Sequence, residues 1–274
     1  MERLAGKVAF VSGAARGQGR SHAVRLAEEG ADIIAVDSCA DVHSAAYPMA
    51  TRDEFDETVA LVEKLDRRIV FRIADVRDNE AVAAALSDGV AELGRLDIVV
   101  ANAGIVSNAP IADLGPGMWG DVVDINLTGV YNTARNAVPY LIEAGSGAMV
   151  FTGSALGTRP MQNSAHYVAA KAGVVGLMRA LALELAPHLI RVNTVSPSMV
   201  NTKMIHNEAM YRLFLPDIET PTPKQAEEAF SISPMPFPWV EANDVSNAVA
   251  FLVSEEARYV TGQDLKIDCG FSLG

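Results

Sequence analysis

Val8-Ala-Phe-Val-Ser-Gly-Ala-Ala-Arg-Gly-Gln-Gly19 joins an apolar run to a glycine-rich turn and then to the start of a helix. Residues 8–12 are almost entirely apolar, which is typical of a strand buried on both faces of a sheet. Glycines in such a turn let the backbone approach a phosphate closely, and the first N–H groups of the helix are free to bind it. The segment therefore predicts a dinucleotide site.

The same alternation of strand and helix continues along the 274-residue chain. Apolar runs predict strands at residues 8–12, 32–37, 69–74, 97–101, 148–152, 190–195 and 264–268. Ala/Leu-rich stretches predict helices at 17–29, 53–66, 79–93, 118–143, 165–186 and 243–254. Such alternation gives right-handed crossovers. We therefore predict an α/β fold, a single-domain, Rossmann-type, doubly wound parallel sheet of about seven strands with helices on both faces, over residues 1–274.

Composition narrows the class of partner and the compartment. Half of the residues are hydrophobic, and the net charge of −12 argues against nucleic acid and against an anionic membrane surface. The two cysteines, Cys39 and Cys269, have no metal-ligand spacing. We expect a cytoplasmic protein without signal peptide, membrane span or metal site.

Asp37 ends the second predicted strand. A carboxylate there accepts hydrogen bonds from both hydroxyls of an adenosine ribose and repels a 2′-phosphate, so it favours NAD over NADP. Arg16 and Arg20 favour the opposite choice, because either guanidinium is able to bind a 2′-phosphate. NAD is the predicted cofactor, and NADP is the less favoured one.

Tyr167 and Lys171 lie four residues apart in a predicted helix, and Ser154 precedes them. Residues at this spacing share one helix face. A nearby ammonium lowers the pKa of a phenol, which is otherwise a poor base at neutral pH. Each residue alone fits a structural role, as a loop cap, a core ring or a surface charge. Together, after a dinucleotide motif, they predict a proton-transfer site in which Ser154 orients the substrate oxygen.

With these motifs in this order, the chain resembles the short-chain dehydrogenase/reductase family over nearly its whole length. The family's Asn-Asn-Ala-Gly motif is present with its first residue replaced, as Ala101-Asn102-Ala103-Gly104. The resemblance implies that Asn126 is an active-site residue holding a water that links Lys171 to solvent, although an asparagine at a helix kink would look the same. It also implies that Lys171 hydrogen-bonds the nicotinamide ribose.

The resemblance then assigns the remaining positions. The implied catalytic residues are Asn126, Ser154, Tyr167 and Lys171. The implied cofactor-binding residues are Gly13, Arg16, Gly17, Gln18, Gly19, Asp37, Asp75, Val76, Asn102, Ala103, Gly104, Tyr167, Lys171, Pro197, Val200 and Thr202.

Three features resemble a narrower, carveol-dehydrogenase-like and mycofactocin-associated branch: the turn around Gly13, the loop with Tyr47-Pro-Met-Ala50, and the ending Asp268-Cys-Gly-Phe271. This implies NAD held without ready exchange and re-oxidised by an external redox cofactor. The long loop at residues 38–50 is then a flap over the adenosine half, and a surface insertion without a role is the open alternative. Thr51 and Glu54 predict a capping box that opens the next helix.

The segment 203–240 is rich in methionine, proline and aromatic residues, which predicts a helical substrate lid with an apolar wall. Met204, Met210, Phe214, Phe230 and Met235 are the expected wall residues, unless they pack on the body of the fold. The substrate is then a small hydrophobic alcohol or ketone, with a monocyclic terpenoid favoured. The family implies a homotetramer formed through the helices at 118–143 and 165–186.

The predicted function is NAD-dependent hydride transfer that interconverts a hydrophobic secondary alcohol, favoured to be carveol-like, and its ketone. Two alternatives stay open. One is a 3-oxoacyl thioester reductase that uses NADPH, and Asp37 argues against it. The other is a non-catalytic NAD-binding regulator, which has no use for the set of Ser154, Tyr167 and Lys171.

Overall fold

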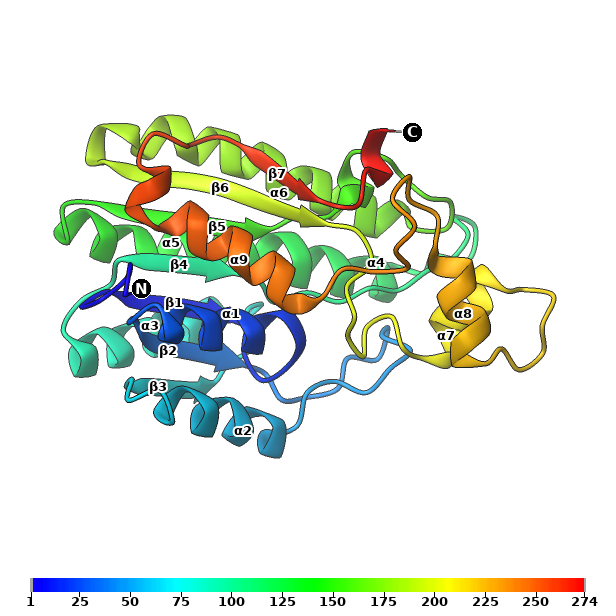
Figure 1. Ribbon diagram of the computed structural model, residues 1–274, viewed down its shortest axis with the longest axis horizontal. Helices are drawn as coiled ribbons and strands as arrows, with labels where there is room; N and C mark the ends of the chain where they lie inside the picture. The colour runs from blue at the N-terminus through cyan, green and yellow to red at the C-terminus, as the bar shows by residue number, and fades with distance from the viewer. Residues whose placement is uncertain (1, 274) are drawn as a thin grey trace.

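A computed structural model describes residues 2–273 and contains one sheet of seven parallel strands. The order is β3-β2-β1-β4-β5-β6-β7, so the chain begins near the middle and winds outward in both directions (Figure 1). The strands are β1 (Val8–Ser12), β2 (Asp32–Asp37), β3 (Ile69–Ile73), β4 (Ile98–Ala101), β5 (Gly147–Thr152), β6 (Ile190–Pro197) and β7 (Asp264–Ile267). The order reverses between β1 and β4, where doubly wound folds bind ligands at the carboxyl ends of their strands. The predicted fold class is confirmed.

Helices cover both faces of the sheet and bury a separate apolar core on each. On one side lie α1 (Gly17–Glu28), α2 (Arg52–Glu63) and α9 (Ala242–Val253). On the other lie α3 (Asn79–Leu93), α5 (Gly129–Glu143) and α6 (Ala165–Leu185). Side chains of β1 alternate between the two cores, with Ala9 and Val11 in the first and Val8 and Phe10 in the second.

The predicted helix at 118–143 is present without a break, but it is not α-helical throughout. It consists of α4 (Pro116–Val123), a π-helical turn (Asp124–Thr128) and α5. The Asn126 side chain occupies this turn and is fully buried. Its Nδ2 donates to Val122 O and Ile105 O, both at 2.9 Å. The wider turn thus places an amide beside the loop that follows β4, and π-turns of this kind are frequent at functional sites.

Two segments extend beyond the carboxyl ends of the strands. Residues 38–50, here called the flap, contain no helix or strand and connect β2 to α2. Residues 203–240, here called the lid, contain α7 (Glu208–Phe214) and α8 (Pro223–Phe230), which lie at the far right of Figure 1. Among residues 2–273, no helix combines the length and apolarity that crossing a bilayer requires.

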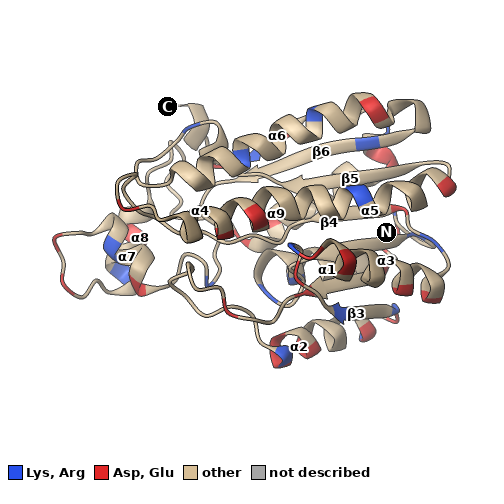
Figure 2. Ribbon diagram, turned by 180° about the vertical axis from the view of Figure 1, so that it is seen from behind, with Lys and Arg blue, Asp and Glu red and all other residues tan. Residues whose placement is uncertain are grey.

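Acidic and basic residues are interspersed over the helices and loops (Figure 2). Many are paired, as in the contacts of Arg3 and Arg25 with the buried Glu29. The net charge of −12 therefore belongs to a surface of mixed sign.

Candidate active site

A cavity of about 490 Å³ lies at the carboxyl edge of the sheet, bordered by the flap and the lid. Every residue predicted to be catalytic or to bind the cofactor lines it. The predicted residues come from the ends of six strands, β1 to β6, and from two helical segments, so the fold brings them together. The cavity residues that the sequence also singled out are Gly13, Arg16, Gly17, Gln18, Gly19, Asp37, Asp75, Val76, Asn102, Ala103, Gly104, Asn126, Ser154, Tyr167, Lys171, Pro197, Val200 and Thr202.

The glycine-rich turn after β1 forms a cradle with no room for side chains. Gly13 has φ +67°, and a Cβ atom there would lie 2.9 Å from the Cα of Ala103. A Cβ on Gly19 would lie 1.9 Å from the Gly13 carbonyl oxygen. The following helix α1 has no side-chain cap and no acidic residue in its first turn, and the buried Oε1 of Gln18 has no partner within residues 2–273. A bare helix N-terminus behind a glycine turn fits the phosphates of a dinucleotide.

The strand ends behind this cradle are tied together by hydroxyl and amide groups. The buried Ser12 Oγ accepts hydrogen bonds from the backbone N–H groups of Asn102 and Ala103, at 3.0 and 3.1 Å. The Asn102 amide donates to Ser12 O, and Thr152 Oγ1 donates to the Asn102 side-chain oxygen. The loss of the family's first asparagine at Ala101 therefore leaves this network in place.

The Asp37 carboxylate accepts hydrogen bonds from Ala15 N at 3.0 Å and Cys39 N at 3.1 Å. Burial raises its pKa, and these backbone donors together with the Arg16 charge oppose the rise. The carboxylate is therefore fixed between the glycine-rich turn and the start of the flap, where it faces the cavity.

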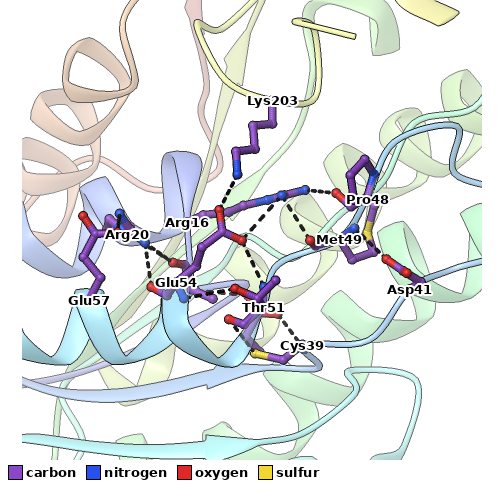
Figure 3. Close-up of polar contacts among 12 residues, drawn as sticks. Arg16, Arg20, Cys39, Asp41, Pro48, Met49, Thr51, Glu54, Glu57 and Lys203 are labelled. Atoms are coloured by element: carbon purple, nitrogen blue, oxygen red, sulfur yellow. Dashed lines mark hydrogen bonds and ion pairs between the residues drawn. The ribbon is translucent and has the colours of Figure 1, made fainter. Parts of the chain in front are cut away.

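Neither arginine that favoured NADP is free to bind a phosphate. Arg16 donates to Pro48 O at 2.5 Å and Met49 O at 3.2 Å, and its guanidinium lies 3.7 Å from Glu54 (Figure 3). Arg20 pairs with Glu57 at 2.6 Å and donates to two backbone carbonyls. Both guanidinium groups are committed to the flap or to α2, which weakens the case for NADP.

Asp75 is also engaged within the protein. Burial alone would raise its pKa, but hydrogen bonds and charge from Arg77 outweigh that effect and lower it. The Arg77 guanidinium lies 2.7 Å from the Asp75 carboxylate and 3.0 Å from Asp121. Asp75 thus stays charged and oriented at the rim of the cavity, with Val76 beside it.

Tyr167 and Lys171 share one face of α6, as their spacing predicted. The Lys171 side chain is buried, with Nζ donating to Thr152 O at 2.8 Å and lying 5.8 Å from the Tyr167 ring centroid. Burial lowers the pKa of Lys171 to about 8. Burial likewise raises the pKa of Tyr167, against a hydrogen bond with Ser154 that lowers it.

The expectation that Lys171 lowers the pKa of Tyr167 therefore does not hold for the protein alone. Desolvation of the phenol is the larger effect, because a buried anion loses its water. The ammonium points to the end of β5 rather than to the phenol oxygen.

Ser154 has the capping role that the sequence left open, and its hydroxyl also lies in the cavity with Tyr167. It caps the short 3₁₀ turn Ala155–Gly157, because its Oγ accepts from Leu156 N at 3.2 Å. The same buried hydroxyl is near enough to the phenol of Tyr167 to lower its pKa. The cap fixes the hydroxyl beside the phenol, so a structural role and a catalytic role are compatible here.

The flap is packed into the cavity wall rather than lying free on the surface. Val42 and Met49 pack against the apolar cluster of Val76, Ile105, Val122 and Ile125, which also includes the Tyr167 ring. Tyr47 is only 8% exposed, and its hydroxyl accepts a hydrogen bond from Val106 N at 3.2 Å. The predicted capping box is confirmed, since Thr51 and Glu54 bond each other reciprocally at the start of α2.

The lid confirms only part of its predicted wall. Met204 and Met210 line the cavity. Phe214 and Phe230 instead stack edge to face at 4.9 Å in the lid's own core, and Met235 is 52% exposed. The apolar composition of the lid therefore did not predict which of these five side chains line the cavity.

The chain is similar to known proteins over nearly its whole length. A family model described as enoyl-(acyl carrier protein) reductase matches residues 13–272. A (−)-trans-carveol dehydrogenase from Rhodococcus erythropolis is 53% identical over 277 aligned residues that cover 100% of both chains. The chain belongs to the short-chain dehydrogenase/reductase family. The family resemblance and the expectation of an oxidoreductase are thus confirmed.

Two solved structures of this family extend the match to three dimensions. Carveol dehydrogenase from Mycobacterium avium in complex with NAD has a TM-score of 0.98 and 52% identity, over 99% of each chain. A short chain dehydrogenase from Mycobacterium paratuberculosis bound to NAD has a TM-score of 0.91 and 41% identity, over 99% of this chain and 100% of that one. Both relatives support the prediction of NAD.

Sequence reasoning missed several cavity residues of this short-chain dehydrogenase/reductase. Tyr47, Met49 and Glu54 come from the flap and the start of α2, and Phe271 comes from the C-terminal turn. The sequence marked the first two only through the resemblance of the segment Tyr47-Pro-Met-Ala50, which indicated a flap but not which of its side chains face the cavity. The role of Glu54 was hidden because a glutamate at the third position of a helix is explained by the capping box alone.

Proposed function

We propose that this chain is an NAD-dependent alcohol dehydrogenase that interconverts a hydrophobic secondary alcohol and its ketone. The observation that carries the proposal is the joint placement of Ser154, Tyr167 and Lys171 in the same cavity as the phosphate cradle and Asp37. A scaffold that merely binds a dinucleotide needs the cradle but not the buried phenol and amine. We therefore favour catalysis over the non-catalytic regulator.

In this mechanism Tyr167 is the general base for alcohol oxidation and the general acid for ketone reduction. Ser154 holds the substrate oxygen against the phenol and stabilises charge that develops on it. When bound, NAD would supply the hydride acceptor and, in its oxidised form, a positive charge in the cavity that would favour the phenolate. Lys171, whose pKa burial lowers to about 8, holds an exchangeable proton at Nζ, 5.8 Å from the centroid of the phenol ring.

Asn126 acts through its backbone rather than its side chain in this proposal. The side-chain Nδ2 of Asn126 donates to Val122 O and Ile105 O, and its Oδ1 accepts from Ile105 N. Both polar atoms of the side chain are therefore engaged. The π-helical turn leaves backbone carbonyls without their usual helical partners, and such a carbonyl is a suitable site for the water that links Lys171 to solvent. Asn126 thereby positions both the loop after β4 and the proton path.

The cradle and Asp37 would hold NAD with its phosphates at the start of α1 and its adenosine ribose at the end of β2. Val200 and Thr202, which follow β6 and line the same cavity, would meet the nicotinamide end, as the family resemblance implies. The apolar residues Met204, Ile205 and Met210 support a hydrophobic substrate. The carveol dehydrogenases among the relatives favour a monocyclic terpenoid alcohol.

The flap supports retention of NAD between turnovers and its re-oxidation by an external redox cofactor. Arg16 and Tyr47 fasten the flap across the cavity, so the dinucleotide leaves only after these contacts break. We further propose a homotetramer in the cytoplasm, built through α4, α5 and α6, which carry the exposed Trp119, Tyr131 and Leu183. The organisation as one catalytic domain with a flap and a lid belongs to the same proposal.

The second candidate, a 3-oxoacyl thioester reductase using NADPH, has support among the relatives. A 3-oxoacyl-[acyl-carrier-protein] reductase from Thermotoga maritima is 32% identical over 99% of this chain, and the description of the family model also names an acyl-carrier substrate, although an enoyl reductase reduces a carbon–carbon double bond. Asp37 and the engagement of Arg16 and Arg20 by carbonyls and carboxylates argue against a 2′-phosphate.

The test is to purify the protein without added nucleotide and to identify what denaturation releases. The proposal predicts bound NAD, its reduction on addition of carveol, and slow turnover with free NAD unless an artificial electron acceptor is present. A protein that is purified empty and rapidly reduces an acetoacetyl thioester with NADPH would establish the second candidate instead.

A further inference from the structure

Tyr47 joins the flap to the wall of the substrate site. The wall is the loop after β4, where Ile105 and Val106 follow the glycine of the Asn-Ala-Gly motif. The side chain of Asn126 holds the backbone of Ile105 through two hydrogen bonds, accepting from Ile105 N and donating to Ile105 O. The next backbone donor, Val106 N, is taken by the hydroxyl of Tyr47. One side of this wall is thus held by a buried helix, and the other is held by a loop.

The same wall contacts the lid. Val106 packs against the lid core, which contains Ile205, Met210 and Phe230. Tyr47 therefore reaches across the cavity to a residue that the lid also uses. Flap, wall and lid meet at Val106.

The Tyr47 hydroxyl is placed to act on the substrate half as well as on the cofactor half. Its ring is 8% exposed, and burial, followed by a smaller effect of the nearby Tyr167, raises its pKa to about 12. The group therefore stays protonated at neutral pH. It accepts from Val106 N, and within residues 2–273 no acceptor takes its own proton.

We propose that Tyr47 is a positioning residue for the substrate: it sets the Ile105–Val106 wall from the flap, so that closing the flap over the dinucleotide and forming the substrate site are one event. This inference rests on the proposed function, because both ligands must share the cavity. By linkage, a ligand on the substrate side stabilises the closed flap and slows release of the dinucleotide.

Neighbouring contacts make the role of Tyr47 separable from that of the flap as a whole. Arg16 holds the carbonyls of the next two residues, Pro48 and Met49. Tyr47→Phe keeps the ring in place and removes only the hydroxyl. Tyr211→Phe is the matched control, since Tyr211 is 9% exposed and its hydroxyl contacts His206 within the lid.

The experiment measures two quantities on protein loaded with NAD. One is the carveol concentration that half-saturates reduction of bound NAD in a single turnover. The other is the rate at which bound NAD exchanges with labelled NAD, with and without carvone. Loss of one buried hydrogen bond predicts that Tyr47→Phe raises the half-saturating concentration about tenfold, with the maximal rate nearly unchanged.

For Tyr47→Phe we also expect faster exchange of NAD and no slowing by carvone, whereas Tyr211→Phe keeps the slowing. Faster exchange with an unchanged half-saturating concentration would overturn the inference and leave Tyr47 as a cover for the cofactor alone. A wild type whose NAD exchange is indifferent to carvone would overturn it as well. A wild type that shows the slowing but does not oxidise carveol would instead contradict the proposed function.

Discussion

The flap and the lid both cover the carboxyl edge of the sheet, but different forces hold them. The lid contains two capped helices and its own apolar core, in which Tyr211, Phe214 and Phe230 stack on one another. The flap has no helix or strand, and it is held in place by hydrogen bonds to Arg16 and Val106 of the body. A segment with its own core keeps its shape when it moves, whereas a segment held only by outside contacts loses its shape when those contacts break.

This difference suggests a division of labour. The lid supplies a shaped apolar wall for the substrate, and the flap supplies a fastening whose release lets the dinucleotide exchange. Variants in the two segments should therefore affect different quantities, in proportion to what each contact contributes.

Among variants of the flap and the lid, Phe230→Ala is expected to have the largest effect on stability and binding. Phe230 is 1% exposed in the lid core, and truncating a buried phenylalanine costs about 3–5 kcal/mol. The lid should become susceptible to proteolysis within residues 203–240 and lose its affinity for alcohol, while NAD stays bound. Phe237→Ala is the control, because Phe237 is 51% exposed. Loss of bound NAD in Phe230→Ala would contradict the division of labour.

Arg16→Gln should act on the flap and leave the lid intact. A charged hydrogen-bond donor contributes about 1.5–3 kcal/mol, so loss of the contacts to Pro48 and Met49 predicts exchange of bound NAD at least about tenfold faster. Exchange of labelled NAD is the measurement. Arg52→Gln removes the same charge from an exposed pair with Asp56 on α2 and should have no effect. Equal exchange rates for the two variants would rule out Arg16 as the fastening.

A smaller effect is expected for Glu54→Gln. Glu54 pairs with Arg16 at 3.7 Å and with Lys203, the first residue of the lid, at 2.7 Å (Figure 3). Glutamine preserves the capping box, so only the charge is lost. Because Lys203 is 65% exposed, the pair contributes about 1 kcal/mol or less, which predicts NAD exchange a few-fold faster at low salt.

High salt should erase the difference between Glu54→Gln and the wild type, since mobile ions screen exposed charges. Glu57→Gln is the matched control on the same helix, as Glu57 pairs with Arg20. A change in NAD exchange that is equally large in Glu57→Gln would mean that the helix, rather than the link between flap and lid, is responsible.

The sequence predicted the sheet and the site well for a shared reason. Strands buried on both faces are continuous apolar runs, and β1 and β2 start where the pattern placed them. Motif residues such as Gly13 and Asp37 follow strand ends, so predicting the strands placed them at one edge. Tyr167 and Lys171 depended only on helix spacing.

The sequence failed where the structure depends on contacts between distant segments. The π-turn at Asn126 requires its bonds to Ile105, which no local pattern reveals. The position of the flap depends on Arg16 and Val106; the family resemblance indicated a flap, but the aperiodic loop did not reveal these contacts. The pKa of Tyr167 was expected to fall beside Lys171, but burial raises it, and burial is a property of the packed fold.

Reduction of bound NAD in a single turnover tests the central claim most directly, namely that Tyr167 is the base in the dinucleotide cavity. With saturating carveol, the wild type should form reduced nicotinamide at a rate that keeps rising with pH over the range in which the protein stays folded, because burial raises the pKa of the phenol that must lose its proton. Tyr167→Phe, carrying the same amount of NAD, should be about a thousandfold slower across that range. A Tyr167→Phe protein that reduces its NAD at the rate of the wild type would contradict the account.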